Sequence, residues 1–166
     1  MDDFAQWKRE RTTLLDWSAL GRVLDGMRDR ILKDSFRPQA VIGIARGGLV
    51  PAIYFANALK AADFHILGML RNASDEPFSA KRSPTLCWES PMPDLSGKSL
   101  LVVDDIVGDG ETMALAIATV RDRDAAEIRT AAVARYQGSR FTPDYCGITA
   151  DGWIVFPWEA SSDGEV

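Results

Sequence analysis

The stretch LLVVDDIVGDGET, from Leu100 to Thr112, decides the fold class of this chain. Its first four residues are aliphatic, which is typical of a strand that is buried on both faces of a parallel sheet. Two aspartates, Asp104 and Asp105, end the aliphatic run, and two glycines follow before a helical pattern begins. A buried strand that runs into acids and glycines predicts a ligand site at its carboxyl end.

The same alternation of strand and helix extends through the rest of the chain. Apolar residues spaced along one face predict a helix that begins near residue 17, with Asp16 or Ser18 as its N-cap. Further strands are expected at 40–45, 63–70, 127–136 and 153–158. Helices are expected from within RGGLVPA, residues 46–52, through about residue 59 and at 111–124, and a long irregular loop with four prolines at 71–93. This order predicts an α/β fold, with a mainly parallel twisted sheet and helices on both sides.

The composition favours one domain and argues against two classes of function. The chain has 166 residues, of which 46% are hydrophobic, and a net charge of −5. We therefore expect a single domain over residues 1–166. Clustered Lys and Arg would be needed to bind a nucleic acid or an anionic membrane surface, so neither is an expected partner. No apolar run approaches the ~20 residues that cross a bilayer.

The cysteines and the histidine also narrow the chemistry. Cys87 and Cys146 form no CxxC pattern, and the N-terminal residues lack an apolar signal core, so we expect a cytoplasmic protein. The single histidine, His65, lies within the apolar stretch DFHILGML and is interpreted as a strand residue. Catalysis by a Ser–His pair or a His-bound metal is therefore not expected.

The first of two glycine-bearing turns is ARGG, residues 45–48, which follows the strand at 40–45. Adjacent glycines let backbone N–H groups approach a ligand closely, and the next helix offers its positive end to an anion. Arg46 adds a forked donor. The alternative is a tight turn with a solvated arginine, and the turn alone favours neither interpretation.

The second turn is DDIVGDGET, residues 104–112. Adjacent carboxylates repel each other, so Asp104 and Asp105 suggest sugar hydroxyls or hydrated Mg²⁺ between them. Gly108 and Gly110 free the backbone to form an anion nest at the helix start. A sugar phosphate would use both features. The alternative is a solvated acidic turn in which residue 109 or 111 caps the helix.

The two turns together resemble a known family. LLVVDDIVGDGET resembles the 5-phosphoribosyl-1-pyrophosphate (PRPP) signature of type I phosphoribosyltransferases, and VIGIARGGLVPA, residues 41–52, resembles their pyrophosphate loop. DLSGKSLLVVDD and PDYCGITADGWIVFPWE resemble the purine branch, the xanthine and hypoxanthine-guanine transferases of bacteria and archaea. The resemblance runs from about residue 17 to residue 159.

The resemblance implies a type I phosphoribosyltransferase fold with a small hood formed by about residues 1–16 and 137–160. It also implies transfer of 5-phosphoribose from PRPP to a purine or purine-like base, with release of pyrophosphate and with Mg²⁺ as cofactor. The partners would be these small molecules and, because relatives form dimers or tetramers, further copies of the chain. Residues 71–93 would be the flexible loop that closes over the reaction.

The resemblance also assigns roles to residues of the sugar-phosphate site. A cis peptide between Ala45 and Arg46 would turn the amides of residues 46–48 toward pyrophosphate. Asp104 and Asp105 would hold the ribose hydroxyls and Mg²⁺. The PRPP-binding set would comprise Ala45, Arg46, Gly47, Gly48, Asp104, Asp105, Gly108, Asp109, Gly110, Glu111 and Thr112.

The part of the site that recognises the base departs from the family pattern. Purine relatives commonly have DDxxDTGxT, whereas Gly108 stands here at the third aspartate and Asp109 at the threonine. We interpret Asp109 as a substitute for the missing acid, which gives a catalytic set of Asp104, Asp105, Asp109 and Arg46. A carboxylate in the phosphate cup would, however, repel the phosphate.

The expected base-binding residues are Gln137, Trp153 and Ile154. Gln137 stands where relatives have a lysine that recognises the purine, and the other two would form the hood over the base. Core packing is the alternative for Trp153. These departures leave two other functions open: a non-catalytic protein of the same fold that binds PRPP or nucleotides and regulates, and transfer to a non-purine acceptor.

Overall fold

The computed structural model describes residues 8–72, 81–92 and 94–159. In chain order they form β1 (Lys8–Leu14), α1 (Trp17–Lys33), β2 (Ala40–Ala45), α2 (Leu49–Ala58), β3 (Asp63–Asn72), β4 (Lys81–Glu89), β5 (Ser99–Val107), α3 (Glu111–Arg121), β6 (Glu127–Tyr136), β7 (Tyr145–Ala150) and β8 (Gly152–Val155). Among these elements, none of the helices is long and apolar enough to cross a membrane.

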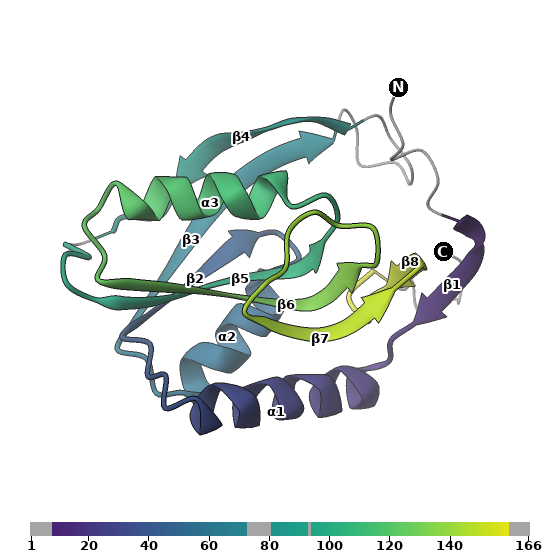
Figure 1. Ribbon diagram of the computed structural model, residues 1–166, viewed down its shortest axis with the longest axis horizontal. Helices are drawn as coiled ribbons and strands as arrows, with labels where there is room; N and C mark the ends of the chain where they lie inside the picture. The colour runs from purple at the N-terminus through teal and green to yellow at the C-terminus, as the bar shows by residue number, and fades with distance from the viewer. Residues whose placement is uncertain (1–7, 73–80, 93, 160–166) are drawn as a thin grey trace.

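Six strands form the main sheet, in the order β4-β3-β2-β5-β6-β7. All neighbours pair in parallel except β3 and β4. The chain moves outward from β2 to β3 on one side and from β5 to β6 and β7 on the other, so the strand order reverses between β2 and β5 (Figure 1). The predicted α/β fold is confirmed, and the two glycine-bearing turns follow the two strands at this switch point.

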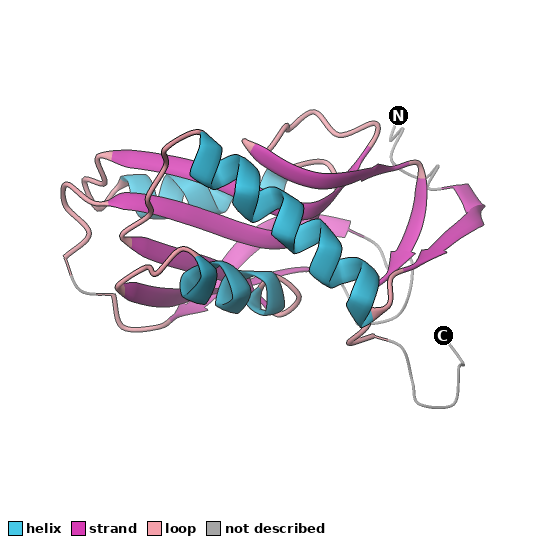
Figure 2. Ribbon diagram, turned by 90° about the horizontal axis from the view of Figure 1, so that it is seen from below, coloured by secondary structure: helices cyan, strands magenta, loops and turns pink. Residues whose placement is uncertain are grey.

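Helices cover both faces of the sheet, with α1 and α2 on one face and α3 on the other (Figures 1 and 2). Alternate side chains of β5 point to opposite faces. Leu101 packs into the core beneath α1 and α2, whereas Val102 packs into the core beneath α3.

The helix α1 begins at its N-cap Asp16, whose carboxylate accepts the backbone N–H of Ala19 at 2.6 Å. Asp16, rather than Ser18, is therefore the cap.

The expectation of an irregular segment over 71–93 is wrong for residues 71–72 and 81–89, which are strand, and is confirmed for residues 90–92. β4 forms an antiparallel pair with β3, in which Leu70 lies opposite Thr85. Proline usually disfavours a strand because it lacks an N–H donor, but Pro84 is tolerated because β4 is an edge strand. Residues 73–80 and 93 of the expected loop lie outside the described residues.

The terminal strands differ from the expectation in a second way. Residues 153–158 were expected to add a strand to the main sheet, but β8 ends at Val155 and pairs in parallel with β1 in a separate two-stranded sheet. β7 was not predicted and lies within the range expected for the hood, yet it forms an edge of the main sheet beside β6. Its half-exposed side chains give neither an apolar run nor a regular alternation.

His65 is a strand residue, as predicted, and lies in β3 with 6% of its surface exposed. Both cysteines are free.

Candidate active site

The turn after β2 packs against the end of β5. The peptide bond between Ala45 and Arg46 is cis, the conformation that the resemblance implied. A Cβ on Gly47 would overlap with the carboxylate of Asp105, and one on Gly48 would lie 2.6 Å from the carbonyl oxygen of Ile44. Glycine at both positions therefore allows the turn and the acidic strand end to approach each other.

The two aspartates lie on opposite sides of β5. Asp105 faces Gly47 and the start of α2, whereas Asp104 lines a small hollow beside the start of α3. Each carboxylate accepts one backbone N–H: Asp104 that of Asp105, at 3.0 Å, and Asp105 that of Ile106, at 2.7 Å. The carboxylate of Asp105 therefore faces the turn after β2, and that of Asp104 faces the turn after β5.

Burial makes both carboxylates weaker acids than usual. It raises the pKa of Asp104 well above its ordinary value of 3.8, and the charge of Asp105 adds to this effect. Burial also raises the pKa of Asp105, from 3.8 to about 6, and the nearby carboxylate of Glu159 contributes. Ionising both carboxylates is therefore unfavourable in this site unless a bound cation or hydroxyl donors stabilise the charge.

The donor set fits a magnesium ion that shares its ligands with a substrate. Within the described residues, no group of three or more His, Cys, Asp or Glu side chains is arranged to hold a metal. Mg²⁺ is commonly bound by one or two carboxylates, with the remaining positions taken by water and substrate phosphates. Asp105, which faces the turn after β2, can supply one such carboxylate, whereas Asp104 faces the start of α3 on the other side of β5.

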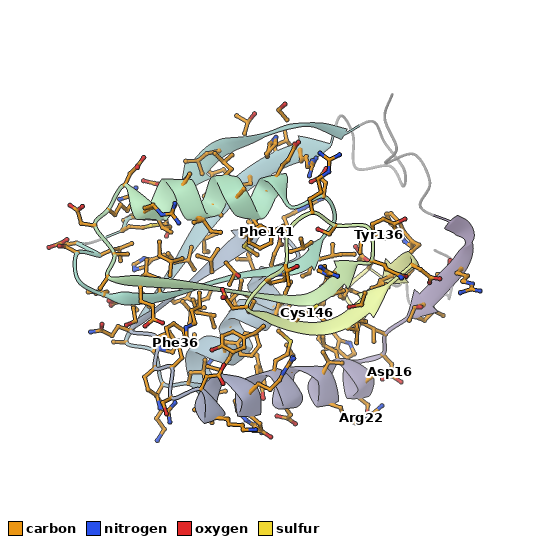
Figure 3. The ribbon with its side chains drawn as sticks, in the orientation of Figure 1. Asp16, Arg22, Phe36, Tyr136, Phe141 and Cys146 are labelled. Atoms are coloured by element: carbon orange, nitrogen blue, oxygen red, sulfur yellow. The ribbon has the colours of Figure 1, made fainter. Side chains whose placement is uncertain are left out.

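The second turn forms the start of α3. Gly110 has φ of 97°, a left-handed conformation that favours glycine. A Cβ there would also overlap with Phe141, which comes from the loop between β6 and β7 (Figure 3). The turn encloses a hollow of about 20 Å³. The residues that line it are Arg71, Asp104, Ile106, Val107, Gly108, Gly110, Thr112 and Met113. This space holds about one water molecule and is smaller than a phosphate group.

Asp109 points neither freely to solvent nor into an open cup, because it forms a bidentate ion pair with Arg71. Nη1 and Nη2 of Arg71 donate to the two carboxylate oxygens of Asp109, and Nη2 also donates to Glu111 at 3.1 Å. Asp109 Oδ1 accepts the backbone N–H of Glu111 at 3.0 Å as well. The side chain of Asp109 is 9% exposed. In this arrangement its carboxylate is not available as an acid or base.

Arg71 is the site residue that sequence reasoning missed. It was interpreted only as the start of the long loop, whereas it lies near the carboxyl end of β3, the strand next to β2. A basic residue at the carboxyl end of a strand beside the switch point was the signal that could have identified it.

The residues expected to bind the base lie in different environments. Gln137 is exposed just after β6, and its backbone N–H donates to the carbonyl of Ala150 at 2.8 Å. Trp153 in β8 is half-buried. Ile154 is 3% exposed and belongs to the core beside α1, so its side chain is not available to a base. Arg46, the charged residue of the first turn, is exposed.

The aromatic side chains that follow β8 form a cluster of their own. Phe156 and Trp158 stack at 4.7 Å between ring centroids, and Trp17 of α1 lies 6.3 Å from Trp158. The C-terminal part of the expected hood is thus fixed to the first helix.

Comparison with known proteins gives consistent similarities. A model of the phosphoribosyl transferase domain matches residues 10–165. The xanthine-guanine phosphoribosyltransferase of a Ruegeria species is 30% identical over 147 residues, which are 87% of this chain and 79% of the relative. The structure of a purine phosphoribosyltransferase from Pyrococcus horikoshii has a TM-score of 0.76 and 27% identity over 90% of this chain and 95% of that one. A hypothetical protein from Neisseria gonorrhoeae, solved with bound ppGpp, has a TM-score of 0.79 and 23% identity over 92% and 91% of the two chains.

Proposed function

We propose, because the chain belongs to the phosphoribosyl transferase domain family, that it transfers 5-phosphoribose from PRPP to a purine or purine-like base and releases pyrophosphate. The observation that carries this proposal is the packing of Gly47 against Asp105 at the switch point of the sheet. It brings a turn suited to pyrophosphate next to a strand end suited to ribose.

The reaction replaces the bond between C1 of the ribose and pyrophosphate with a bond to a ring nitrogen of the base. Its oxocarbenium-like transition state depends on neutralising the leaving group and excluding water more than on a strong nucleophile. We assign the amides of Arg46, Gly47 and Gly48 to the pyrophosphate, and Asp104 and Asp105 to the ribose hydroxyls and to Mg²⁺. Bound Mg²⁺ would neutralise charge on the pyrophosphate oxygens.

We assign the 5′-phosphate to the backbone from Gly108 to Thr112. The turn precedes α3, and the N–H groups at a helix start attract anions. The hydroxyl of Thr112, which lines the hollow, adds a further donor. The hollow has to widen to accept the phosphate, because its present volume suits about one water molecule.

The base is the least constrained part of the proposal. Gln137 is exposed near the carboxyl end of β6, where its amide can both donate and accept a hydrogen bond. It therefore suits a 6-oxo or a 6-amino purine, whereas a lysine would donate only. We propose Trp153, with the backbone of Ile154, as the hood over the base.

The direct test is an assay of pyrophosphate release with PRPP, Mg²⁺ and a panel of xanthine, guanine, hypoxanthine and adenine. We expect turnover with at least one base and its loss in Asp105→Asn. Circular dichroism should show that the variant is folded. Absence of turnover with every base, from a folded protein that binds PRPP, would reject the transferase function.

A second candidate function is a non-catalytic protein that binds PRPP or nucleotides and regulates. The pairing of Asp109 with Arg71 favours it, because the carboxylate that was expected to act as the acid already accepts hydrogen bonds from Arg71. Calorimetry with PRPP, GMP and ppGpp separates the candidates. Nucleotide binding without pyrophosphate release would favour regulation, and the absence of any binding would reject it.

We also propose that the protein acts in the cytoplasm as a homo-oligomer, with residues 1–166 as one domain. The two free cysteines support a reducing compartment. Light scattering after size-exclusion chromatography measures the oligomeric state, and a monomeric mass would contradict this assignment.

A further inference from the structure

We propose that Arg71 binds the 5′-phosphate and that Asp109 competes with the phosphate for the same guanidinium group. This inference rests on the proposed function, because it concerns the phosphate subsite of that site. It assigns a ligand to a residue on β3, outside the two turns that carry the family resemblance.

The position of Arg71 is the first observation. Of the residues that line the hollow at the start of α3, Arg71 is the one that carries a positive charge. The others that contact this space and can donate are Thr112 and the backbone of the glycine turn. A phosphate dianion that enters the hollow therefore meets the guanidinium group of Arg71 on the side of β3. A guanidinium group is the side-chain group best suited to recognise phosphate.

The unfilled donor of Arg71 is the second observation. Its two terminal nitrogens are occupied by Asp109, but Nε is buried and has no acceptor among the described residues. A buried N–H without an acceptor is costly, and the side chain of Arg71 is only 16% exposed. A turn of the guanidinium group away from Asp109 and toward a ligand oxygen would give this donor an acceptor.

The small size of the hollow is the third observation. Its volume of about 20 Å³ is too small for a phosphate group, and Arg71, which lines it, is paired with Asp109. The carboxylate of Asp109 also carries the same sign of charge as the ligand. The phosphate thus has to share Arg71 with Asp109 or displace that carboxylate, and either event makes Asp109 oppose binding.

The two charges are therefore expected to act in opposite directions on affinity. A unit charge ~6 Å from a phosphate changes binding by up to about a hundredfold at an effective dielectric of ~20, and solvent reduces this effect. We expect Asp109→Asn to bind ribose 5-phosphate about tenfold more tightly than the wild type. A purely structural ion pair would give no such gain when one partner is removed.

Loss of Arg71 is best measured where Asp109 is already neutral. Arg71→Gln alone leaves a buried carboxylate without its partner, which strongly destabilises a fold. The informative comparison is therefore Asp109→Asn against the double variant Arg71→Gln with Asp109→Asn. We expect the double variant to bind ribose 5-phosphate at least tenfold more weakly than Asp109→Asn.

The experiment is calorimetry of the full chain with ribose 5-phosphate, with ribose as the ligand that lacks the phosphate. Arg123→Gln is a matched control, because Arg123 forms an ion pair with Glu89 beyond the other end of α3. It should leave the affinity unchanged, and urea unfolding should show that all variants are folded.

Two results would overturn the inference. One is an Asp109→Asn variant that binds ribose 5-phosphate no more tightly than the wild type. The other is a double variant with the same affinity as Asp109→Asn. Either result, in a protein that still releases pyrophosphate from PRPP, leaves the proposed function intact. A wild-type protein that binds neither PRPP nor ribose 5-phosphate would reject both.

Discussion

Replacing Asp105 with asparagine is expected to stabilise the metal-free fold while abolishing transfer. The side chain of Asp105 is partly buried beside Gly47, and its partial removal from water raises its pKa from 3.8 to about 6. The ionised side chain is thus less favourable in the folded protein than in the unfolded chain. Asparagine removes the charge, and its amide oxygen can still accept the N–H of Ile106.

The magnitude and its pH dependence follow from the same pKa. Because the folded pKa lies above the unfolded one, the stability that protonated Asp105 provides is fully present below pH 3.8 and is lost as the pH rises through about 6. Each pKa unit corresponds to about 1.4 kcal/mol, so asparagine should raise the free energy of unfolding by at most about 3 kcal/mol at pH 8. At pH 5 the gain should fall to about half of that value.

The assay is urea unfolding of wild type and Asp105→Asn at pH 8 and pH 5, with EDTA present. Asp122→Asn is a suitable control, because Asp122 is an exposed acid at the end of α3. Loss of its charge at the helix C-terminus should give a gain of at most ~1 kcal/mol that is equal at both pH values. Unfolding of Asp105→Asn at lower urea than the wild type at pH 8, or an equal gain at both pH values, would contradict this expectation.

Three further predictions concern the backbone, the acid and the metal. Gly48→Ala should lower the free energy of unfolding by about 3 kcal/mol, because its Cβ would meet the backbone oxygens of Ile44 and Val103 at 2.6 and 2.7 Å. Gly21→Ala, which has open space around it in α1, should raise that free energy by up to ~1 kcal/mol, and thermal unfolding compares the two. Asp109→Asn should lower kcat about a hundredfold in steady-state assays if the carboxylate serves as the acid after leaving Arg71; an unchanged kcat would remove it from the catalytic set. EDTA should abolish pyrophosphate release and added Mg²⁺ should restore it, whereas full activity in EDTA would contradict the assignment of Asp104 and Asp105 to a metal.

Much of the fold could be predicted because its signals are local. The aliphatic run from Leu100 to Val103 has no polar residue, as a strand covered on both faces requires, and the two glycine-bearing turns follow such strands. Elements with weaker patterns were missed. β4 contains a proline that only an edge position tolerates, and the half-exposed β7 has no regular alternation.

The sequence by itself determined the α/β class, the location of the site at the carboxyl ends of strands and the acidic strand end, because each depends on residues that are neighbours in the chain. Only the tertiary structure decided what those acids contact. The pleat of β5 directs Asp105 toward Gly47 and Asp104 toward α3. Strand order brings Arg71 to Asp109 across 38 positions of sequence. An ion pair between such distant residues leaves no periodic signal, since it depends on which strand ends meet at one edge of the sheet.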